Sequence, residues 1–143
     1  MNVAAILKAK GRAVATARPE TIIQQIVETL AAHKIGALVV VGEDGRVAGI
    51  VSERDIIRVI ARRKGDCLSE PVSSIMTRKV VTCTEADTLD ALMSIMTENR
   101  FRHIPVVEND TLTGIVSIGD VVKNRVAEVE MEATAMRTYL SAG

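Results

Sequence analysis

The sequence GIVSERDII at residues 49–57 returns as GIVSIGDVV at residues 114–122, a spacing of 65. The similarity continues upstream, where LVVV at residues 38–41 matches IPVV at residues 104–107 at a spacing of 66. The first copy therefore has one extra residue in the intervening turn. A repeat of this length indicates a supersecondary unit that is present twice and is stabilised by packing against its copy.

Each copy has the same order of periodic segments. A short helical turn and a brief strand come first, followed by an amphipathic helix with apolar residues at i, i+3, i+4 and i+7. An almost fully apolar strand follows, as is typical of a strand buried on both faces. A polar turn, a third strand and a second helix starting near Asp55 or Asp120 complete the copy. The predicted strands span residues 13–16, 37–41 and 47–51 in the first copy and 80–83, 103–107 and 112–116 in the second.

This order predicts an α/β fold in which two βαββα motifs are related by a pseudo-twofold axis and pack sheet against sheet. Gly65 as a helix stop and Pro71 as a helix breaker delimit a linker. The predicted organisation is a first motif at 1–64, a linker at 65–71, a second motif at 72–124 and a C-terminal helix at 125–143.

The C-terminal segment is long for a closing helix. Val122, Val126, Val129, Ala133 and Met136 fall on one stripe at spacings of three and four, and most charges lie off it. Two interpretations are open: the helix packs on its own module, or it packs against a second subunit. Symmetric pairing through such a stripe would make the protein a homodimer or a larger oligomer.

The composition excludes several classes of function. The 18 Lys and Arg residues balance the 18 Asp and Glu residues, whereas binding to nucleic acid generally needs a basic excess. Phe101 and Tyr139 are the only aromatic residues, too few for a platform that stacks bases. The longest apolar stretch, residues 35–42, is far shorter than the roughly 20 residues of a membrane span. We therefore expect neither a nucleic-acid nor a membrane partner.

The two cysteines, Cys67 and Cys83, lie in no CxxC motif and have no histidine nearby, which argues against a metal site. Free thiols in a cytoplasmic protein are the favoured interpretation, and a disulfide between the two stays open.

The repeated pattern resembles the cystathionine β-synthase (CBS) domain, and two copies in tandem resemble a Bateman module. GIVSERD at 49–55 and RHIPVV at 102–107 carry the resemblance, which covers roughly residues 3–124. It implies a stand-alone regulatory module, with an adenine nucleotide as regulatory ligand in clefts between the motifs. The candidate ligands are AMP, ADP, ATP, NAD(H) and S-adenosylmethionine. The module would modulate an unidentified partner protein.

Two Ser-x-x-Asp corners are the first candidate binding residues. Ser52 and Asp55 in the first copy, and Ser117 and Asp120 in the second, each lie between a strand and a helix. One interpretation is a capping box. The other is a ligand site, because free N–H groups at such a corner can bind phosphate. The resemblance implies that the Asp binds the ribose, and both interpretations can hold together.

Further candidates come from charge and from the resemblance. An Arg at the positive end of a helix, as Arg54 is, favours a nearby anion. Each charged candidate is also open to a plain surface role. The remaining candidates are Arg78, Lys79, Arg102, His103, Ile104 and Pro105.

The two clefts are expected to differ. If each corner faces the early strands of the other copy, the Asp55 corner meets several cations, whereas the Asp120 corner meets only Lys10 and Arg12. The Asp55 cleft should then favour highly charged ligands, and the Asp120 cleft should bind more weakly or accept a less charged compound. Because rings are scarce, the adenine is expected to lie between aliphatic side chains.

The sequence carries no nucleophile elbow, P-loop or GxGxxG motif, so we predict that the protein is not an enzyme and has no catalytic cofactor. Two alternatives to a nucleotide sensor stay open. One is a dimerisation module without a ligand, and the other is an accessory subunit of a nucleotide-metabolising enzyme.

Overall fold

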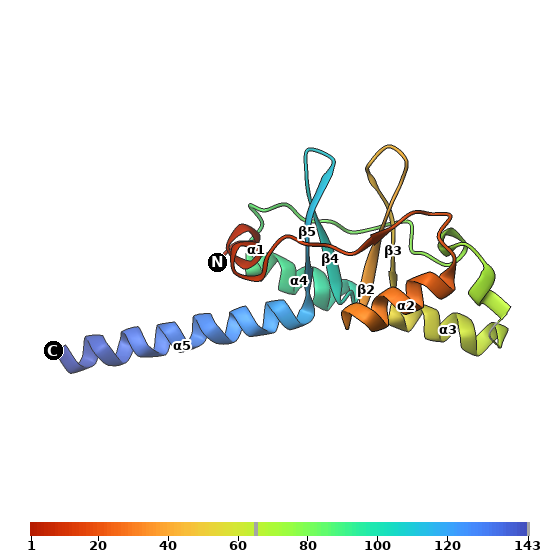
Figure 1. Cartoon of the computed structure of the whole chain (residues 1–143). Coiled ribbons are helices and arrows are strands. Elements are labelled where there is room, and N and C mark those ends of the chain that lie inside the picture. Colours follow the sequence, from red (N-terminus) through yellow and green to blue (C-terminus); the bar gives the residue numbers. More distant parts are fainter. Residues whose placement is uncertain (65, 143) are drawn as a thin grey trace.

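Two β-hairpins stand side by side with helices along one side of them in the computed structural model, which describes residues 1–64 and 66–142 (Figure 1). In the first motif, β1 pairs in parallel with β2, and β2 pairs antiparallel with β3. In the second, β4 and β5 form an antiparallel pair. The strands are β1 (Thr16–Ala17), β2 (Ala37–Val41), β3 (Val47–Ser52), β4 (His103–Glu108) and β5 (Thr111–Ser117). The helices are α1 (Val3–Lys10), α2 (Ile23–His33), α3 (Glu53–Arg63), α4 (Leu89–Asn99) and α5 (Ile118–Ala142), with two 3-10 turns, η1 (Asp66–Ser69) and η2 (Val72–Ser74).

The backbone contacts of the two motifs repeat with the sequence, which confirms the predicted α/β fold and its pseudo-twofold relation. Ala17 pairs in parallel with Val40, and 66 residues later Cys83 pairs in parallel with Val106. The predicted strand at 80–83 is wrong, because this single bridge is its only ladder contact in the described chain. The predicted strand at 13–16 is shifted and shortened to Thr16–Ala17.

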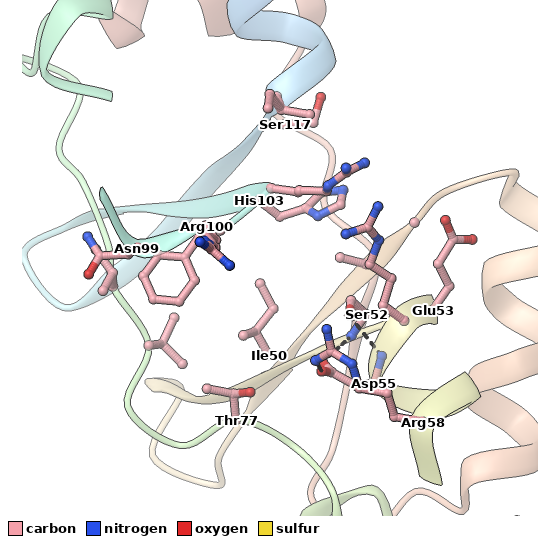
Figure 2. Close-up of a pocket in the computed structure, with 18 of the residues that line it drawn as sticks. Ile50, Ser52, Glu53, Asp55, Arg58, Thr77, Asn99, Arg100, His103 and Ser117 are labelled. Carbon is pink, nitrogen blue, oxygen red and sulfur yellow. Dashed lines mark hydrogen bonds and ion pairs between the residues drawn. The ribbon is translucent and has the colours of Figure 1, made fainter. Parts of the chain in front are cut away.

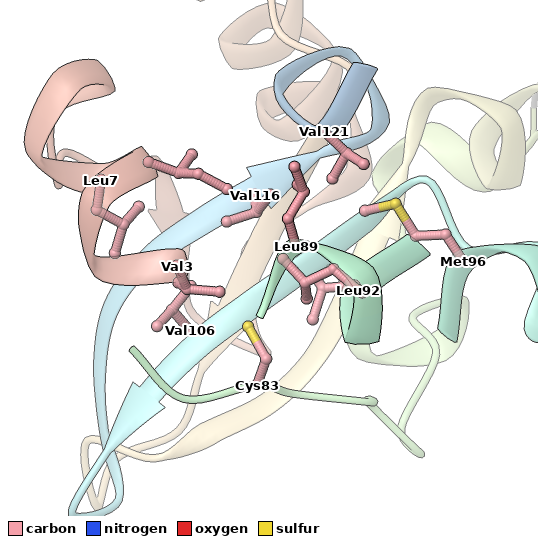
Figure 3. Close-up of a cluster of buried hydrophobic side chains, with 11 residues drawn as sticks. Val3, Leu7, Cys83, Leu89, Leu92, Met96, Val106, Val116 and Val121 are labelled. Carbon is pink, nitrogen blue, oxygen red and sulfur yellow. The ribbon is translucent and has the colours of Figure 1, made fainter. Parts of the chain in front are cut away.

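The opening segment of each motif packs in the hydrophobic core of the other. Val3 and Leu7 of α1 are fully buried against the second motif, whose core includes Val106 and Val116 (Figure 3). The first core takes in Val72 in the same way. The two motifs therefore exchange their first helical turns. This exchange buries the apolar side chains of both turns and so stabilises the packing of the two motifs against each other.

Two glycines of the repeated GIVS sequence allow this exchange. A Cβ on Gly49 would lie 2.6 Å from Met76 Sδ and 2.9 Å from the Thr77 carbonyl oxygen. A Cβ on Gly114 would lie 2.8 Å from both methyl carbons of Leu7. Each glycine therefore leaves space for the crossing segment of the other motif, which is a packing reason for its recurrence.

One helix, α5, contains both the closing helix of the second motif and residues 125–142 of the predicted C-terminal helix, whose last residue lies outside the described residues. Its start is anchored by Val121, which is buried in the second core, and by an Arg125 Nη1–Asp90 Oδ1 ion pair of 3.2 Å. Beyond this, α5 projects from the body (Figure 1), and Val126 and Val129 are more than half exposed. The predicted stripe thus does not pack on its own module. Within the described chain, no helix is apolar enough over a sufficient length to cross a bilayer.

Both cysteines are free and buried, in different cores. This confirms the preferred interpretation as thiols over a disulfide. Burial, with smaller contributions from the carboxylates of Asp87 and Glu108, raises the pKa of Cys83 to about 12. A thiol with this pKa is not a nucleophile at neutral pH.

Candidate functional site

The two Ser-x-x-Asp corners cap their helices with the same reciprocal hydrogen bonds. Ser52 Oγ accepts from the Asp55 N–H at 3.2 Å, and Asp55 Oδ2 accepts from the Ser52 N–H at 3.0 Å. The corresponding distances for Ser117 and Asp120 are 3.1 and 2.8 Å. The capping interpretation is therefore confirmed at both corners. The same hydrogen bonds hold the carboxylates at the junction of strand and helix, where a ligand can reach backbone N–H groups.

A cavity of about 560 Å³ opens beside the first corner, within the usual size range of small-molecule sites. Its walls come from both motifs: α3 and the ends of β2 and β3 on one side, and the segments before β4 and at the start of α5 on the other. Figure 2 shows Asp55 and Glu53 across the cavity from His103 and Arg100. Seven predicted residues line it: Ser52, Arg54, Asp55, Lys79, Arg102, His103 and Ser117.

Positive charge dominates this cavity. Its cations are Arg54, Arg58, Lys79, Arg100 and Arg102, against the carboxylates of Glu53 and Asp55. The one ion pair among these groups in the described chain is weak: Arg58 Nη1 lies 3.9 Å from Asp55 Oδ1. Four cations thus have no carboxylate partner in residues 1–64 and 66–142. Unpaired cations around a recess create a potential that attracts anions.

His103 lies where the two motifs meet. A Cβ on Gly36 would contact the His103 ring at 3.4 Å, so the glycine leaves room for the imidazole. Burial and the charge of Lys10 lower the pKa of His103 below 6.5, and the carboxylates of Glu53 and Asp120 oppose this only in part. The imidazole is therefore neutral at pH 7 and can both donate and accept a hydrogen bond.

Thirteen further lining residues were not among the predicted binding residues. They are Gly36, Ala37, Ile50, Glu53, Arg58, Thr77, Val80, Val81, Asn99, Arg100, Phe101, Ile118 and Gly119. Arg58 could have been found from its i+3 spacing to Asp55 on α3. Phe101 corrects the expectation that the cavity offers only aliphatic surfaces, since one of the two aromatic rings of the chain lines it.

Four predicted residues lie outside the cavity lining. The Arg78 guanidinium donates to the Ser73 carbonyl at 3.0 Å. Ile104 is fully buried in the second core, and Pro105 is buried within β4, where its carbonyl accepts from the Cys83 N–H. Asp120 contacts Lys10 instead, with Nζ 2.5 Å from Oδ2. The two equivalent aspartates thus have different surroundings: Asp55 lines the cavity, whereas Asp120 contacts Lys10.

Comparison with known proteins agrees with the geometry. The family model of the CBS domain matches twice, at residues 10–62 and 72–127. The chain belongs to the CBS domain family. The CBS domain-containing protein CBSX3, mitochondrial, of Arabidopsis thaliana is 40% identical over 121 residues, which cover 82% of this chain and 59% of that protein. The chain spans less than two thirds of the length of the first curated relatives it matches.

Solved CBS domain structures share the whole arrangement. The CBS-domain containing protein ATU1752 of Agrobacterium tumefaciens is 50% identical, with a TM-score of 0.84 over 87% of this chain and 99% of that one. The CBS domain protein PAE2072 of Pyrobaculum aerophilum, complexed with AMP, is 26% identical, with a TM-score of 0.80 over 93% of this chain and 99% of that one. The CBS domain pair of protein MJ0100, in complex with 5-methylthioadenosine and S-adenosyl-L-methionine, is 27% identical. Its TM-score is 0.80 over 90% of this chain and 98% of that one.

Proposed function

We propose that the chain is a regulatory module that binds an adenine nucleotide in the cavity beside Asp55. The observation that carries the proposal is the combination of an available carboxylate oxygen with cations that have no carboxylate partner. Asp55 Oδ1 has Arg58 as its only cation partner in the described chain, at 3.9 Å, and can accept hydrogen bonds from ribose hydroxyls. Arg54, Arg102 and Lys79 can meet the phosphates. The AMP complex of the related structure supports this ligand class.

The charge of the cavity ranks the candidate ligands. AMP, ADP, ATP and NAD(H) bring phosphates that the cations would stabilise, whereas the sulfonium of S-adenosylmethionine adds positive charge to a cavity that is already positive. We therefore expect the phosphorylated ligands to bind more tightly here. ATP should bind at least as tightly as AMP.

Isothermal titration calorimetry with AMP, ATP and S-adenosylmethionine tests the proposal. Asp55→Asn keeps an acceptor for the Ser52 N–H but removes the charge, and should weaken AMP binding about ten- to hundredfold. Asp110→Asn, at an exposed position whose ion pair with Arg46 is 3.5 Å, is the matched control and should bind as the wild type does. Equal affinity of the folded Asp55→Asn protein and the wild type would refute the assignment.

The role is regulatory rather than catalytic. Among the described residues, the cavity holds no cysteine, and the thiol of Cys83 lies in the second core with its raised pKa. A bound nucleotide would stabilise one arrangement of the two motifs and so alter the contact with a partner protein.

The exposed stripe of α5 supports a second, compatible role, the association of two copies into a homodimer. Val122, Val126, Val129 and Met136 are each more than half exposed on this helix. Two such stripes would cover each other in a symmetric pair.

A further inference from the structure

Lys10 reaches from the end of α1 into the second Ser-x-x-Asp corner. Its Nζ lies 2.5 Å from Asp120 Oδ2 and 2.7 Å from the Ile115 carbonyl oxygen. Gly11 ends the helix directly afterwards with φ 103°, a conformation that glycine adopts without strain. The ammonium group thus has two acceptors on elements more than 100 residues away in the sequence.

The equivalent positions in the first corner are arranged differently. There, the backbone of Thr77 pairs with Ile50, with hydrogen bonds of 2.9 and 3.0 Å, and no side chain among the described residues donates to the Ile50 carbonyl. Ile115 is the counterpart of Ile50 in the repeat, and its carbonyl accepts from the Lys10 side chain. The pseudo-twofold relation therefore fails here, because a cation replaces a backbone pairing.

The carboxylates differ in the same way. Asp55 Oδ2 accepts from the Ser52 N–H, and its Oδ1 has no hydrogen-bond donor in the described chain. Asp120 Oδ2 accepts from the Ser117 N–H at 2.8 Å, from the Ser117 hydroxyl at 2.9 Å and from Lys10 at 2.5 Å, and its Oδ1, like that of Asp55, has no hydrogen-bond donor in the described chain. The difference between the two carboxylates is therefore the close cation at Oδ2 of Asp120. The side chains of Lys10 and Asp120 are 31% and 20% exposed, so water screens this pair less than a surface pair.

The charges around this corner are already balanced within the chain. Burial by itself would raise the pKa of Asp120, but the hydrogen bonds from Lys10 and Ser117 outweigh it and lower the pKa below 3.8. Arg12, the other predicted cation, is 2.5 Å from Glu85. Neither Lys10 nor Arg12 is therefore free to bind a phosphate without losing an internal ion pair.

We propose that Lys10 is a specificity-determining residue that closes the Asp120 corner to the ribose of an adenine nucleotide, so that each chain takes one nucleotide, at Asp55. The inference rests on the proposed function, because it concerns the same ligand class. A ribose diol that binds Asp120 Oδ2 must displace the Lys10 ammonium group from that oxygen and from the Ile115 carbonyl, and a diol at Oδ1 meets a carboxylate whose charge Lys10 already neutralises. Such a charge-assisted contact is stronger than a neutral hydrogen bond, so the exchange is unfavourable.

Titration of AMP into the wild-type protein and Lys10→Met tests this. Methionine keeps the length of the side chain and its helix propensity but removes the ammonium group. The wild type should bind one AMP per chain, and Lys10→Met should gain a second site with affinity raised about ten- to hundredfold. Lys8→Met, on the exposed side of the same helix, is the matched control and should keep one site. Lys10→Met/Asp120→Asn should lose the added site and keep the first.

The outcomes separate this inference from the proposed function. Two equal sites in the wild type, or one site in a Lys10→Met protein with an unchanged circular dichroism spectrum, would overturn the closing role of Lys10 and leave the Asp55 site intact. Absence of AMP binding in the wild type and all variants would overturn both.

Discussion

Asp55 and Asp120 occupy equivalent positions in two copies of one motif, but their carboxylates meet different partners. In the described chain, the cation partner of Asp55 is Arg58 at 3.9 Å, whereas Asp120 pairs with Lys10 at 2.5 Å. A repeated motif thus provides two capping boxes and, by our account, one nucleotide site. The difference arises from Lys10, which reaches Asp120 from the end of α1.

His103 should make the stability of the protein depend on pH. Its pKa is lower in the folded protein than the usual 6.5, mainly through burial, so the unfolded chain binds the proton more readily. The stabilising contribution is therefore complete above 6.5 and is lost as the pH falls through the folded-state pKa. In the wild type, the free energy of unfolding should fall as the pH drops below 6.5, and in His103→Gln it should fall less. Urea titration at several pH values measures both. Equal profiles of unfolding free energy against pH for the wild type and His103→Gln would refute the role of His103.

Much of the candidate site can be predicted from the sequence. The rest depends on contacts between residues that are far apart in the chain. The Ser-Asp corners and the basic residues before β4 are visible locally, because recurrence and spacing place them at strand ends. The repeat also predicted Lys10 and Arg12 near the Asp120 corner, and the structure confirms Lys10 there. It could not give the pairing of each side chain, since Arg12 instead contacts Glu85, 73 positions away in the sequence. Phe101 was missed because one aromatic residue in a loop carries no pattern.

At the scale of elements, the crossing of each opening segment over the opposite sheet depends on glycine. Gly49→Ala would place a methyl group 2.9 Å from the Thr77 carbonyl and 2.6 Å from Met76 Sδ. The Thr77 carbonyl belongs to the backbone and cannot move aside as a flexible side chain can. We therefore expect the free energy of unfolding to fall by about 1–3 kcal/mol. Chemical denaturation of the wild type and of Gly49→Ala measures this difference in the free energy of unfolding.

Gly119→Ala is the control for this substitution. Its Cβ would lie 3.6 Å from Ser117 Oγ, an ordinary contact, and alanine favours the helix. The change should be neutral or stabilising by up to about 1 kcal/mol. A Gly49→Ala protein as stable as the wild type would show that the crossing segment tolerates more space than the structure indicates.

The elements themselves were largely predictable, but their partners were not. Apolar periodicity located α2, α4 and the strands of both hairpins, because each buries a continuous face. The exchange of α1 into the second core was not foreseen, because a short apolar turn has no signal for which core it joins. The exposure of the α5 stripe likewise depends on where the helix points when it leaves β5.

At the scale of the molecule, α5 predicts self-association. Light scattering coupled to size exclusion should give the mass of a dimer or larger oligomer at micromolar concentration, because the apolar stripe is exposed on the single chain. Val126→Asp/Val129→Asp should shift the protein to monomer, since burying two charges in the contact is unfavourable. Thr138→Asp, on the opposite side of α5, should leave the mass unchanged. A wild-type monomer would contradict the prediction.

The central claim is that one corner of the pair binds the nucleotide. Calorimetric titration of ATP into Asp55→Asn and Asp120→Asn measures it directly, because the two variants make the same change at equivalent positions. We predict that Asp55→Asn weakens ATP binding about ten- to hundredfold, whereas Asp120→Asn binds it with nearly wild-type affinity. Equal losses in both variants, or loss in Asp120→Asn alone, would contradict the assignment of the site to Asp55.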